Sequence, residues 1–197
     1  MNPMEWAVAM AALPGEAESG DRHVACKVSA GMLFAVVDGL GHGGEAATAA
    51  NAAIHMLERY AHEPFDRLVW RCHTALRSTR GAVMSLASFN QKERQLCWLG
   101  VGNVAGLLVR ADASIPDETL LLRGGVIGAR LPPLQPAILP IAPGDVLVLA
   151  TDGVGGDFAA SVSAKGPLQP IAERVLTQHA RGEDDALVLM ARFNGDA

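Results

Sequence analysis

Two stretches of the chain carry apolar residues at helical spacing. From Glu45 to Tyr60 the sequence is rich in alanine, lacks Pro and Gly, and gathers its apolar residues on one face, which predicts a helix. A second helix is predicted from about Pro64, because the fixed φ of proline suits a first helical turn. Its apolar stripe continues to Val83 and Leu86, so the two helices follow each other directly.

The remaining sequence consists of short apolar runs separated by Gly, Pro and Asp, which predicts strands. The strands are expected at residues 6–13, 33–38, 94–101, 104–110, 118–123, 135–141, 145–151 and 186–193, with a further helix at 168–181. Strands grouped together and helices grouped in pairs favour a layered α+β domain over an alternating βαβ sheet.

Composition supports one globular domain without a face for nucleic acids. Half of the 197 residues are hydrophobic, the net charge is -5, and 19% of the residues are charged. The apolar run near the N-terminus is too short to span a membrane and lacks the basic flank of a signal peptide. The three cysteines have no CxxC or CxxH spacing, so they are expected to be buried thiols. We therefore expect residues 1–197 to form one cytoplasmic domain without a separate regulatory domain.

Acidic residues border several of the apolar runs. The runs LFAVVDG at 33–39 and LVLATDG at 147–153 both end in Asp-Gly, and neither alternates with polar residues, so these strands are expected to be buried on both faces. Asp-Gly is also a common turn dipeptide, but two further acidic sites weaken that simpler interpretation. The acidic residues concerned are Glu16, Glu18, Asp21, Asp38, Asp152, Asp184 and Asp185.

These carboxylates suggest a particular chemistry if they converge. Neighbouring carboxylates repel each other, and cations relieve the repulsion. Oxygen ligands suit Mg²⁺ or Mn²⁺, and a pair of such ions can activate water and hold a phosphoryl group. Phosphate-ester hydrolysis is therefore the leading interpretation.

The glycines after Asp38 allow an alternative. The sequence GLGHGG at 39–44 matches the dinucleotide fingerprint G-x-G-x-x-G, between a predicted strand and a predicted helix. That fingerprint requires a second parallel strand after the helix, whereas here another helix is predicted. A dinucleotide-binding enzyme is therefore less favoured. GVGN at 100–103 is interpreted as a tight turn with Asn103 in a left-handed conformation.

Five motifs resemble those of the metal-dependent PPM (PP2C-like) protein phosphatases, and among them the SpoIIE-type bacterial serine phosphatases. They are SGD at 19–21, DGLGHG at 38–43, GVGN at 100–103, LATDG at 149–153 and EDDALV at 183–188. The resemblance covers nearly the whole chain and implies a four-layer αββα sandwich, in which helix pairs flank two antiparallel sheets. It also implies two Mn²⁺ or Mg²⁺ ions at one edge.

The resemblance assigns roles to the acidic residues. It implies that Asp38 bridges both ions, that Asp21 and the carbonyl oxygen of Gly39 bind one of them, and that Asp152 and Asp184 bind the other. Asp185 is either a supporting group or an alternative ligand, because many family members have Asn there. Leu187 replaces the threonine of the family motif, which is expected to alter the support of Asp184.

The implied reaction is direct attack of a metal-bridging water on phosphoserine or phosphothreonine, without a phosphoenzyme. The sequence offers no evident Ser-His-Asp or Cys-x₅-Arg arrangement as a competing nucleophile. His42 is a candidate acid for the leaving oxygen, with a structural or exposed role as the alternative. The helical histidines, His55, His62, His73 and His179, are expected to be solvated.

Within this family, the short length and the DGLGHG motif make the chain most similar to a feedback phosphatase of the stressosome. The expected substrate is therefore a phosphorylated regulatory protein, such as a stressosome scaffold protein in a bacterial stress-signalling pathway. A phosphatase fold that has lost turnover and only binds a partner remains as an alternative.

Overall fold

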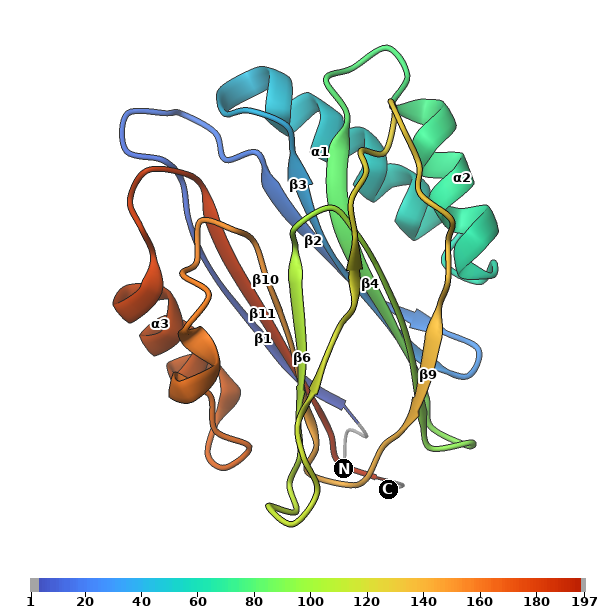
Figure 1. Cartoon of the computed structure of the whole chain (residues 1–197), viewed down its shortest axis with the longest axis vertical. Helices are drawn as coiled ribbons and strands as arrows, with labels where there is room; N and C mark the ends of the chain where they lie inside the picture. Colours follow the sequence, from blue (N-terminus) through green and yellow to red (C-terminus); the bar gives the residue numbers. More distant parts are fainter. Residues whose placement is uncertain (1–3, 196–197) are drawn as a thin grey trace.

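A computed structural model of the chain describes residues 4–195 and contains two β-sheets packed face to face (Figure 1). The first sheet has the spatial order β1 (Met4–Ala11), β11 (Ala186–Phe193), β10 (Val146–Ala150), β6 (Ala105–Val109) and β7 (Glu118–Thr119). The second has the order β2 (Asp21–Val28), β3 (Gly31–Gly39), β4 (Ala82–Asn90), β5 (Gln95–Val101) and β8 (Leu122–Arg123), and β9 (Ala137–Pro140) also pairs with β5. The strands pair antiparallel, except that β5 and β8 run parallel within the described residues.

Helices cover the outer faces of both sheets. The helices α1 (Gly43–Arg59) and α2 (Phe65–Ala75) pack on the second sheet. The helix α3 (Leu168–His179) and the short 3₁₀ helix η1 (Phe158–Ser161) lie against the first sheet. This four-layer arrangement confirms the predicted α+β αββα sandwich, although the second outer layer combines one α-helix with a 3₁₀ turn.

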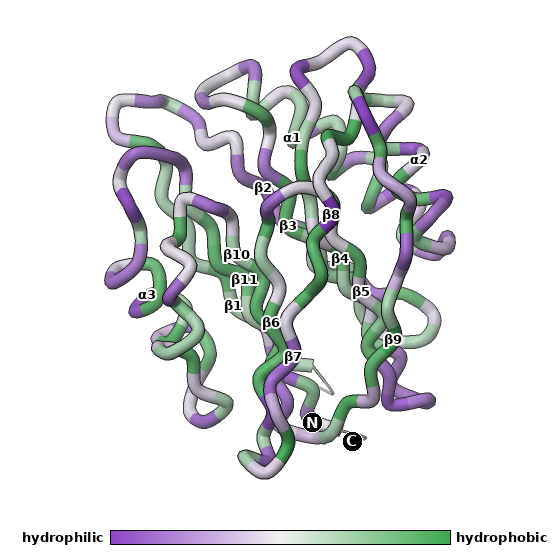
Figure 2. The backbone as a smooth tube through the Cα atoms, viewed as in Figure 1, coloured by the Kyte–Doolittle hydropathy of each residue, from purple (hydrophilic) through white to green (hydrophobic). Residues whose placement is uncertain are grey.

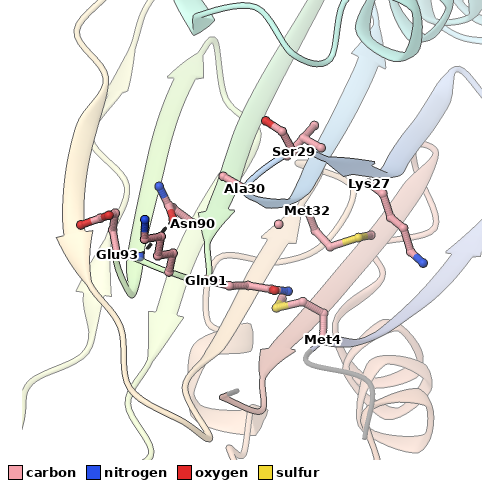
Figure 3. A pocket seen from close by; sticks show the side chains of 11 residues that line it. Met4, Lys27, Ser29, Ala30, Met32, Asn90, Gln91 and Glu93 are labelled. Atoms are coloured by element: carbon pink, nitrogen blue, oxygen red, sulfur yellow. Dashed lines mark hydrogen bonds between the residues drawn. The ribbon is translucent and has the colours of Figure 1, made fainter. Parts of the chain in front are cut away.

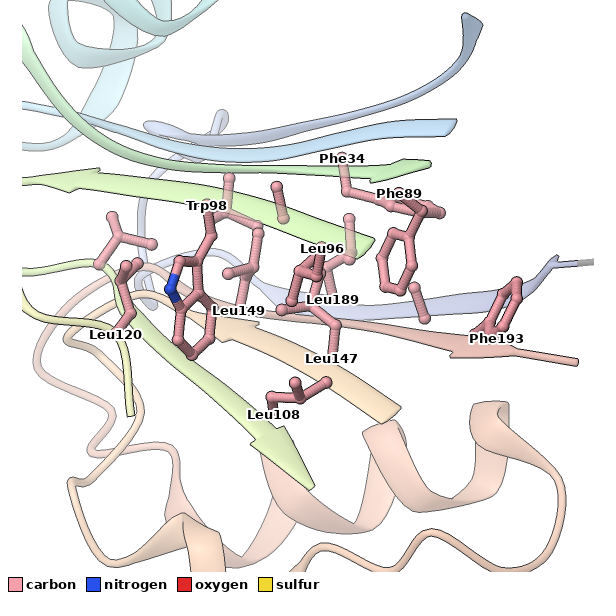
Figure 4. Packing of buried hydrophobic residues seen from close by; sticks show 14 of the residues in the cluster. Phe34, Phe89, Leu96, Trp98, Leu108, Leu120, Leu147, Leu149, Leu189 and Phe193 are labelled. Carbon is pink, nitrogen blue, oxygen red and sulfur yellow. The ribbon is translucent and has the colours of Figure 1, made fainter. Parts of the chain in front are cut away.

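The main core lies between the two sheets (Figure 4). Phe34 and Phe89 meet edge to face there, with ring centroids 5.8 Å apart. Strand β3 is covered on both sides, because Phe34 and Val36 face the other sheet while Leu33 and Val37 face α1 and α2. Burial of each such side chain contributes about 1.5–3 kcal/mol. The prediction that this strand lacks a polar face is therefore confirmed.

Two elements differ from the sequence prediction. The second helix ends at Ala75, and Val83 and Leu86 belong to β4. A spacing of three residues keeps two side chains on one face of a helix but puts them on opposite faces of a strand. Val83 accordingly lies between the sheets and Leu86 under the helices. The segment 118–123 also divides, because β7 pairs in the first sheet and β8 in the second.

Strand β2, at Asp21–Val28, was not predicted. Its sequence DRHVACKV mixes polar and apolar residues, since β2 lies at an edge of its sheet and much of it is only half-buried.

Figure 2 shows how hydropathy varies along the backbone, with hydrophobic colour on β6, β10 and β11 and hydrophilic colour in many loops. Among the described residues, no helix has the length and hydropathy needed to cross a membrane.

Candidate metal centre

The acidic ends of four strands meet at one edge of the sandwich. Asp21 opens β2 and is the direct register partner of Asp38 near the end of β3. Asp152 follows β10, and Asp184 precedes β11, whose start lies beside the end of β10 because these strands are antiparallel. The two sheets are joined here by a hydrogen bond of 2.7 Å from the Thr151 hydroxyl to Oδ2 of Asp21.

The electrostatics of this edge reflect crowded carboxylates. Burial raises the pKa of Asp38 to about 8, and the charges of Asp21, Asp152, Asp184 and Asp185 raise it as well. Burial also raises the pKa of Asp21 to about 7, against the opposing effect of the Thr151 hydrogen bond. The charges that act on both pKa values are carboxylates, so a cation at this edge would be strongly stabilised.

Asp185 is engaged by the loop between β1 and β2. Its Oδ1 accepts the amide of Leu13 at 2.8 Å, and its Oδ2 accepts the amide of Gly20 at 2.6 Å. Asp184 is exposed and accepts the amide of Asp185 at 2.8 Å through Oδ1. The buried Asp185 therefore fixes the loop that leads into Asp21.

Close backbone packing requires glycine after Asp38 and after Asp152. A Cβ at Gly39 would lie 2.1 Å from the carbonyl oxygen of Ala46, and a Cβ at Gly153 would lie 2.0 Å from that of Asp185. The carbonyl oxygen of Gly39 and Oδ2 of Asp185 both lie 3.3 Å from the position of a Cβ at Gly20. The Gly39 carbonyl is thus located among the carboxylates.

Two polar residues of the centre were not predicted. The amide of Asn103 donates a hydrogen bond of 2.6 Å to Oδ2 of Asp152. The left-handed conformation predicted for Asn103 belongs to Gly102, whose φ is 98°. Thr151 was likewise not singled out. Thr151 directly precedes Asp152 in the motif LATDG, so a hydroxyl next to a motif carboxylate was a signal available in the sequence. The motif GVGN contains no carboxylate, so Asn103 gave no such signal.

His42 lies in the loop between β3 and α1, at the N-cap of α1. Its Nδ1 is 2.6 Å from Oε1 of Glu16, and 62% of its side chain is exposed.

One of the helical histidines differs from its prediction. The prediction that His73 is solvated is wrong, since this residue is buried and accepts a hydrogen bond of 3.0 Å from the amide of Gly128. His42, in contrast, is exposed in the loop that follows Asp38.

A Ser-His-Asp chain exists that the sequence did not reveal. His179 Nε2 lies 2.8 Å from the Ser161 hydroxyl, and its Nδ1 lies 3.1 Å from Oδ1 of Asp157. The expectations that no such arrangement exists and that His179 is solvated are therefore wrong. Because 84% of the Asp157 side chain is exposed, solvent screens its charge. These two contacts of His179 hold η1 against the end of α3.

The donor set of the edge fits hard divalent cations. Within residues 4–195, no group of three or more His, Cys, Asp or Glu side chains is placed to form a cage that could hold a metal ion. Mg²⁺ does not need such a cage, because it keeps several waters and binds through one or two carboxylates. The adjacent Asp21, which is buried, and Asp38, which is half-buried, provide this kind of site, with no cation among the charges that act on them.

The structure also contains a cavity of about 730 Å³, and Figure 3 shows the residues that line it. It is bordered by the end of β2 and the turn to β3, including Lys27 and Ser29, and by the turn after β4, including Gln91 and Glu93. The acidic residues occupy the opposite ends of β2 and β3, about 20 Å away along the strands. This cavity is therefore not part of the candidate metal centre.

Comparisons with known proteins agree with the fold and the motifs. The family model of Stage II sporulation protein E (SpoIIE) matches residues 29–194. The phosphoserine phosphatase RsbX of Bacillus subtilis (strain 168) is 36% identical over 77 residues. This matched segment spans 39% of the present chain and 39% of the length of that relative.

Solved structures superpose over almost the whole chain. A structure reported from the bacterial stressosome, described as a modular system adapted to control secondary messenger signaling, has a TM-score of 0.89 at 28% identity. It covers 96% of this chain and 99% of its own. RsbX in complex with magnesium has a TM-score of 0.86 at 23% identity, covering 96% and 94%.

The architecture is that of the PP2C-like phosphatase fold. The predicted resemblance is confirmed, since the SpoIIE family model matches residues 29–194, part of RsbX is similar in sequence, and RsbX is similar in fold. The chain belongs to the SpoIIE family.

Proposed function

We propose that this chain is a metal-dependent protein phosphatase that hydrolyses phosphoserine or phosphothreonine on a regulatory protein. The observation that carries the proposal is the meeting of Asp21 and Asp38 from one sheet with Asp152 and Asp184 from the other. A site of this kind suits phosphoryl transfer, because divalent ions can neutralise its charge while they orient a phosphate. Membership of the SpoIIE family and the partial identity with RsbX support the same activity.

The proposed cofactors are two divalent ions, Mn²⁺ or Mg²⁺. Asp38 would contact both, Asp21 and the Gly39 carbonyl would hold one, and Asp152 and Asp184 would hold the other. When bound, such ions lower the pKa of water and stabilise negative charge on a phosphoryl group. We assign Asp184 as the ligand in preference to Asp185, because both oxygens of Asp185 already accept backbone amides.

The chain's own residues position this centre. Strand β3 places Asp38 where burial disfavours its ionised form, so this carboxylate gains most from a cation. Thr151 orients Asp21, Asn103 orients Asp152, and Asp185 fixes the loop before β2. These hydrogen bonds come from elements of both sheets, so the centre depends on their packing.

His42 is the proposed acid for the departing serine or threonine oxygen. Glu16 engages Nδ1, which leaves Nε2 as the nitrogen available for proton transfer. The exposure of the imidazole allows contact with a protein substrate. The residue lies four positions after Asp38, in the loop that follows the strand bearing the proposed bridging ligand.

The proposed substrates are phosphorylated stressosome-like scaffold proteins in a stress-signalling pathway. The similarity to a stressosome structure and to RsbX supports this choice. A cytoplasmic location is part of the proposal, and the three free cysteines are consistent with a reducing compartment.

A metal-dependence assay tests the function. The chain is incubated with a phosphoserine protein in Mn²⁺, in Mg²⁺ and in chelator, beside the Asp38→Asn variant. We expect phosphate release with either ion and none with chelator. A chain that binds Mn²⁺ in calorimetry but releases no phosphate would be a binding module, and full activity of Asp38→Asn would overturn the site.

A further inference from the structure

Arg80 lies in the turn that joins α2 to β4 and packs on the loop of the candidate metal centre. A Cβ at Gly41 would be 2.6 Å from Nη1 of Arg80. The φ of Gly41 is 90°, which L-amino acids rarely adopt, so glycine provides both the conformation and the close approach. The amide of Leu40 also donates to the carbonyl of Gly81 at 3.0 Å. The backbone therefore fixes Arg80 relative to Asp38.

Arg80 borders a cavity of about 320 Å³. The cavity is lined by Glu45, Thr48, Ser78, Thr79 and Arg80. Arg80 pairs with Glu45, but about half of the Arg80 side chain and 70% of the Glu45 side chain are exposed. Solvent screens such a pair, so an incoming carboxylate can replace Glu45 at little cost.

Another arginine near the centre is fully occupied. The Arg22 guanidinium donates to the carbonyls of Ser19 and Asp21 and to the side chain of Asn51. The rest of this edge is dominated by carboxylates, which repel an acidic side chain of a substrate. Arg80 is therefore positioned to receive a second anionic group beside the phosphate.

We infer that Arg80 and its cavity form a subsite for an acidic side chain near the phosphorylated residue of the substrate. This inference rests on the proposed phosphatase function and adds a preference in substrate sequence. Asp38 and Gly41 are three residues apart, so their Cα atoms are at most about 11 Å apart. An extended peptide covers that distance in about three residues. The acidic residue therefore lies within about three positions of the phosphoserine.

Two synthetic phosphoserine peptides of equal length test the subsite. One carries Glu at the three positions on each side of the phosphoserine, and the other carries Gln there. Steady-state kinetics in Mn²⁺ should give the wild-type chain a KM about tenfold lower for the Glu peptide, with similar kcat. Fluorescence anisotropy of both labelled peptides, with and without Mn²⁺, measures binding independently of turnover.

Three variants separate Arg80 from general electrostatics. Arg80→Ala should raise the KM of the Glu peptide about tenfold and leave the Gln peptide and the calorimetric affinity for Mn²⁺ unchanged. Glu45→Gln removes the competing carboxylate and should lower the KM of the Glu peptide by about two- to threefold. Arg77→Ala is the matched control, because Arg77 is an exposed arginine three residues before Arg80.

The possible failures are distinguishable. If the wild-type chain binds both peptides equally, or if Arg77→Ala acts like Arg80→Ala, the subsite is wrong. An equal effect of Arg80→Ala on the two peptides also overturns it. If the chain hydrolyses neither peptide, the phosphatase function fails, while the anisotropy difference between the Glu and Gln peptides still decides the subsite.

Discussion

The hydroxyl of Thr151 donates a hydrogen bond of 2.7 Å to Oδ2 of Asp21 and so connects the end of β10 with the start of β2 in the opposite sheet. The same hydroxyl accepts the amide of Leu187 at 2.9 Å. Leu187 stands where the family motif has threonine, and its backbone completes this connection. One buried hydroxyl thus links Asp21 to β10 and β11 of the first sheet.

Removal of this hydroxyl should weaken metal binding. We expect Thr151→Val to raise the calorimetric Kd for Mn²⁺ about tenfold, because Asp21 loses its orienting donor. Thr151→Ser keeps the hydroxyl and should retain most of the affinity. Thr177→Val, which removes a hydroxyl bonded within α3, serves as the control. Equal Mn²⁺ affinity of Thr151→Val and the wild type would show that Thr151 does not position the site.

The orientation of Asp152 provides a second test. Asn103→Ala removes the 2.6 Å hydrogen bond to this carboxylate and should raise the Kd for Mn²⁺ about tenfold. Asn90→Ala is a suitable comparison, since Asn90 ends β4 and its side chain accepts the amide of Glu93, away from the carboxylates. The role of Asn103 is refuted if both variants bind Mn²⁺ like the wild type.

The metal-free chain should lose stability as the pH rises. The pKa values of Asp21 and Asp38 are raised from 3.8 to about 7 and about 8. Between about pH 4 and pH 8 the folded chain therefore binds more protons than the unfolded chain, and the free energy of unfolding decreases. In chelator we expect Tm to fall by about 10 °C over this range.

Calorimetry or circular dichroism melts measure this dependence. Saturating Mn²⁺ should recover much of the loss near pH 8, because the ions compensate the ionised carboxylates. Asp38→Asn removes one of the two shifted groups, so its metal-free form should show a weaker pH dependence. A Tm of the wild-type chain in chelator that stays constant between pH 5 and pH 8 contradicts the raised pKa values.

Replacement of the proposed bridging ligand should separate activity from stability. We expect Asp38→Asn to lower kcat about 100-fold or more, because it removes the carboxylate shared by both ions. At pH 8 the metal-free variant should nevertheless melt at a higher temperature than the metal-free wild type, since it lacks a carboxylate whose charged form is disfavoured in the folded chain. Phosphate release and melting curves on the same preparation check both effects.

The proposed acid can be examined through the leaving group. His42→Gln should lower kcat about 100-fold for a phosphoserine peptide, whose alkoxide must be protonated. The same variant should hydrolyse p-nitrophenyl phosphate at nearly the wild-type rate, because nitrophenolate leaves without a proton. A similar loss for both substrates would assign His42 a structural role through Glu16 instead.

Local sequence patterns were sufficient where one physical signal dominated. The alanine-rich segment after residue 44 had no competing pattern, and α1 forms there. The apolar run before Asp38 lacked polar alternation, and β3 is buried between the other sheet and the helices. The apolar spacing that included Val83 and Leu86 was ambiguous between helix and strand, and the packing of β4 decided it.

The sequence by itself determined which residues are acidic, that Asp38 and Asp152 end buried strands, and that glycine follows each of them. Only the tertiary structure decided that Thr151 reaches Asp21 across the two sheets, that Asp185 binds the loop before β2, and that Arg80 packs on Gly41. The physical reason is that strand and helix patterns depend on neighbours in sequence. Hydrogen bonds and electrostatic interactions between residues about 40 to 165 positions apart depend on how the sheets pack.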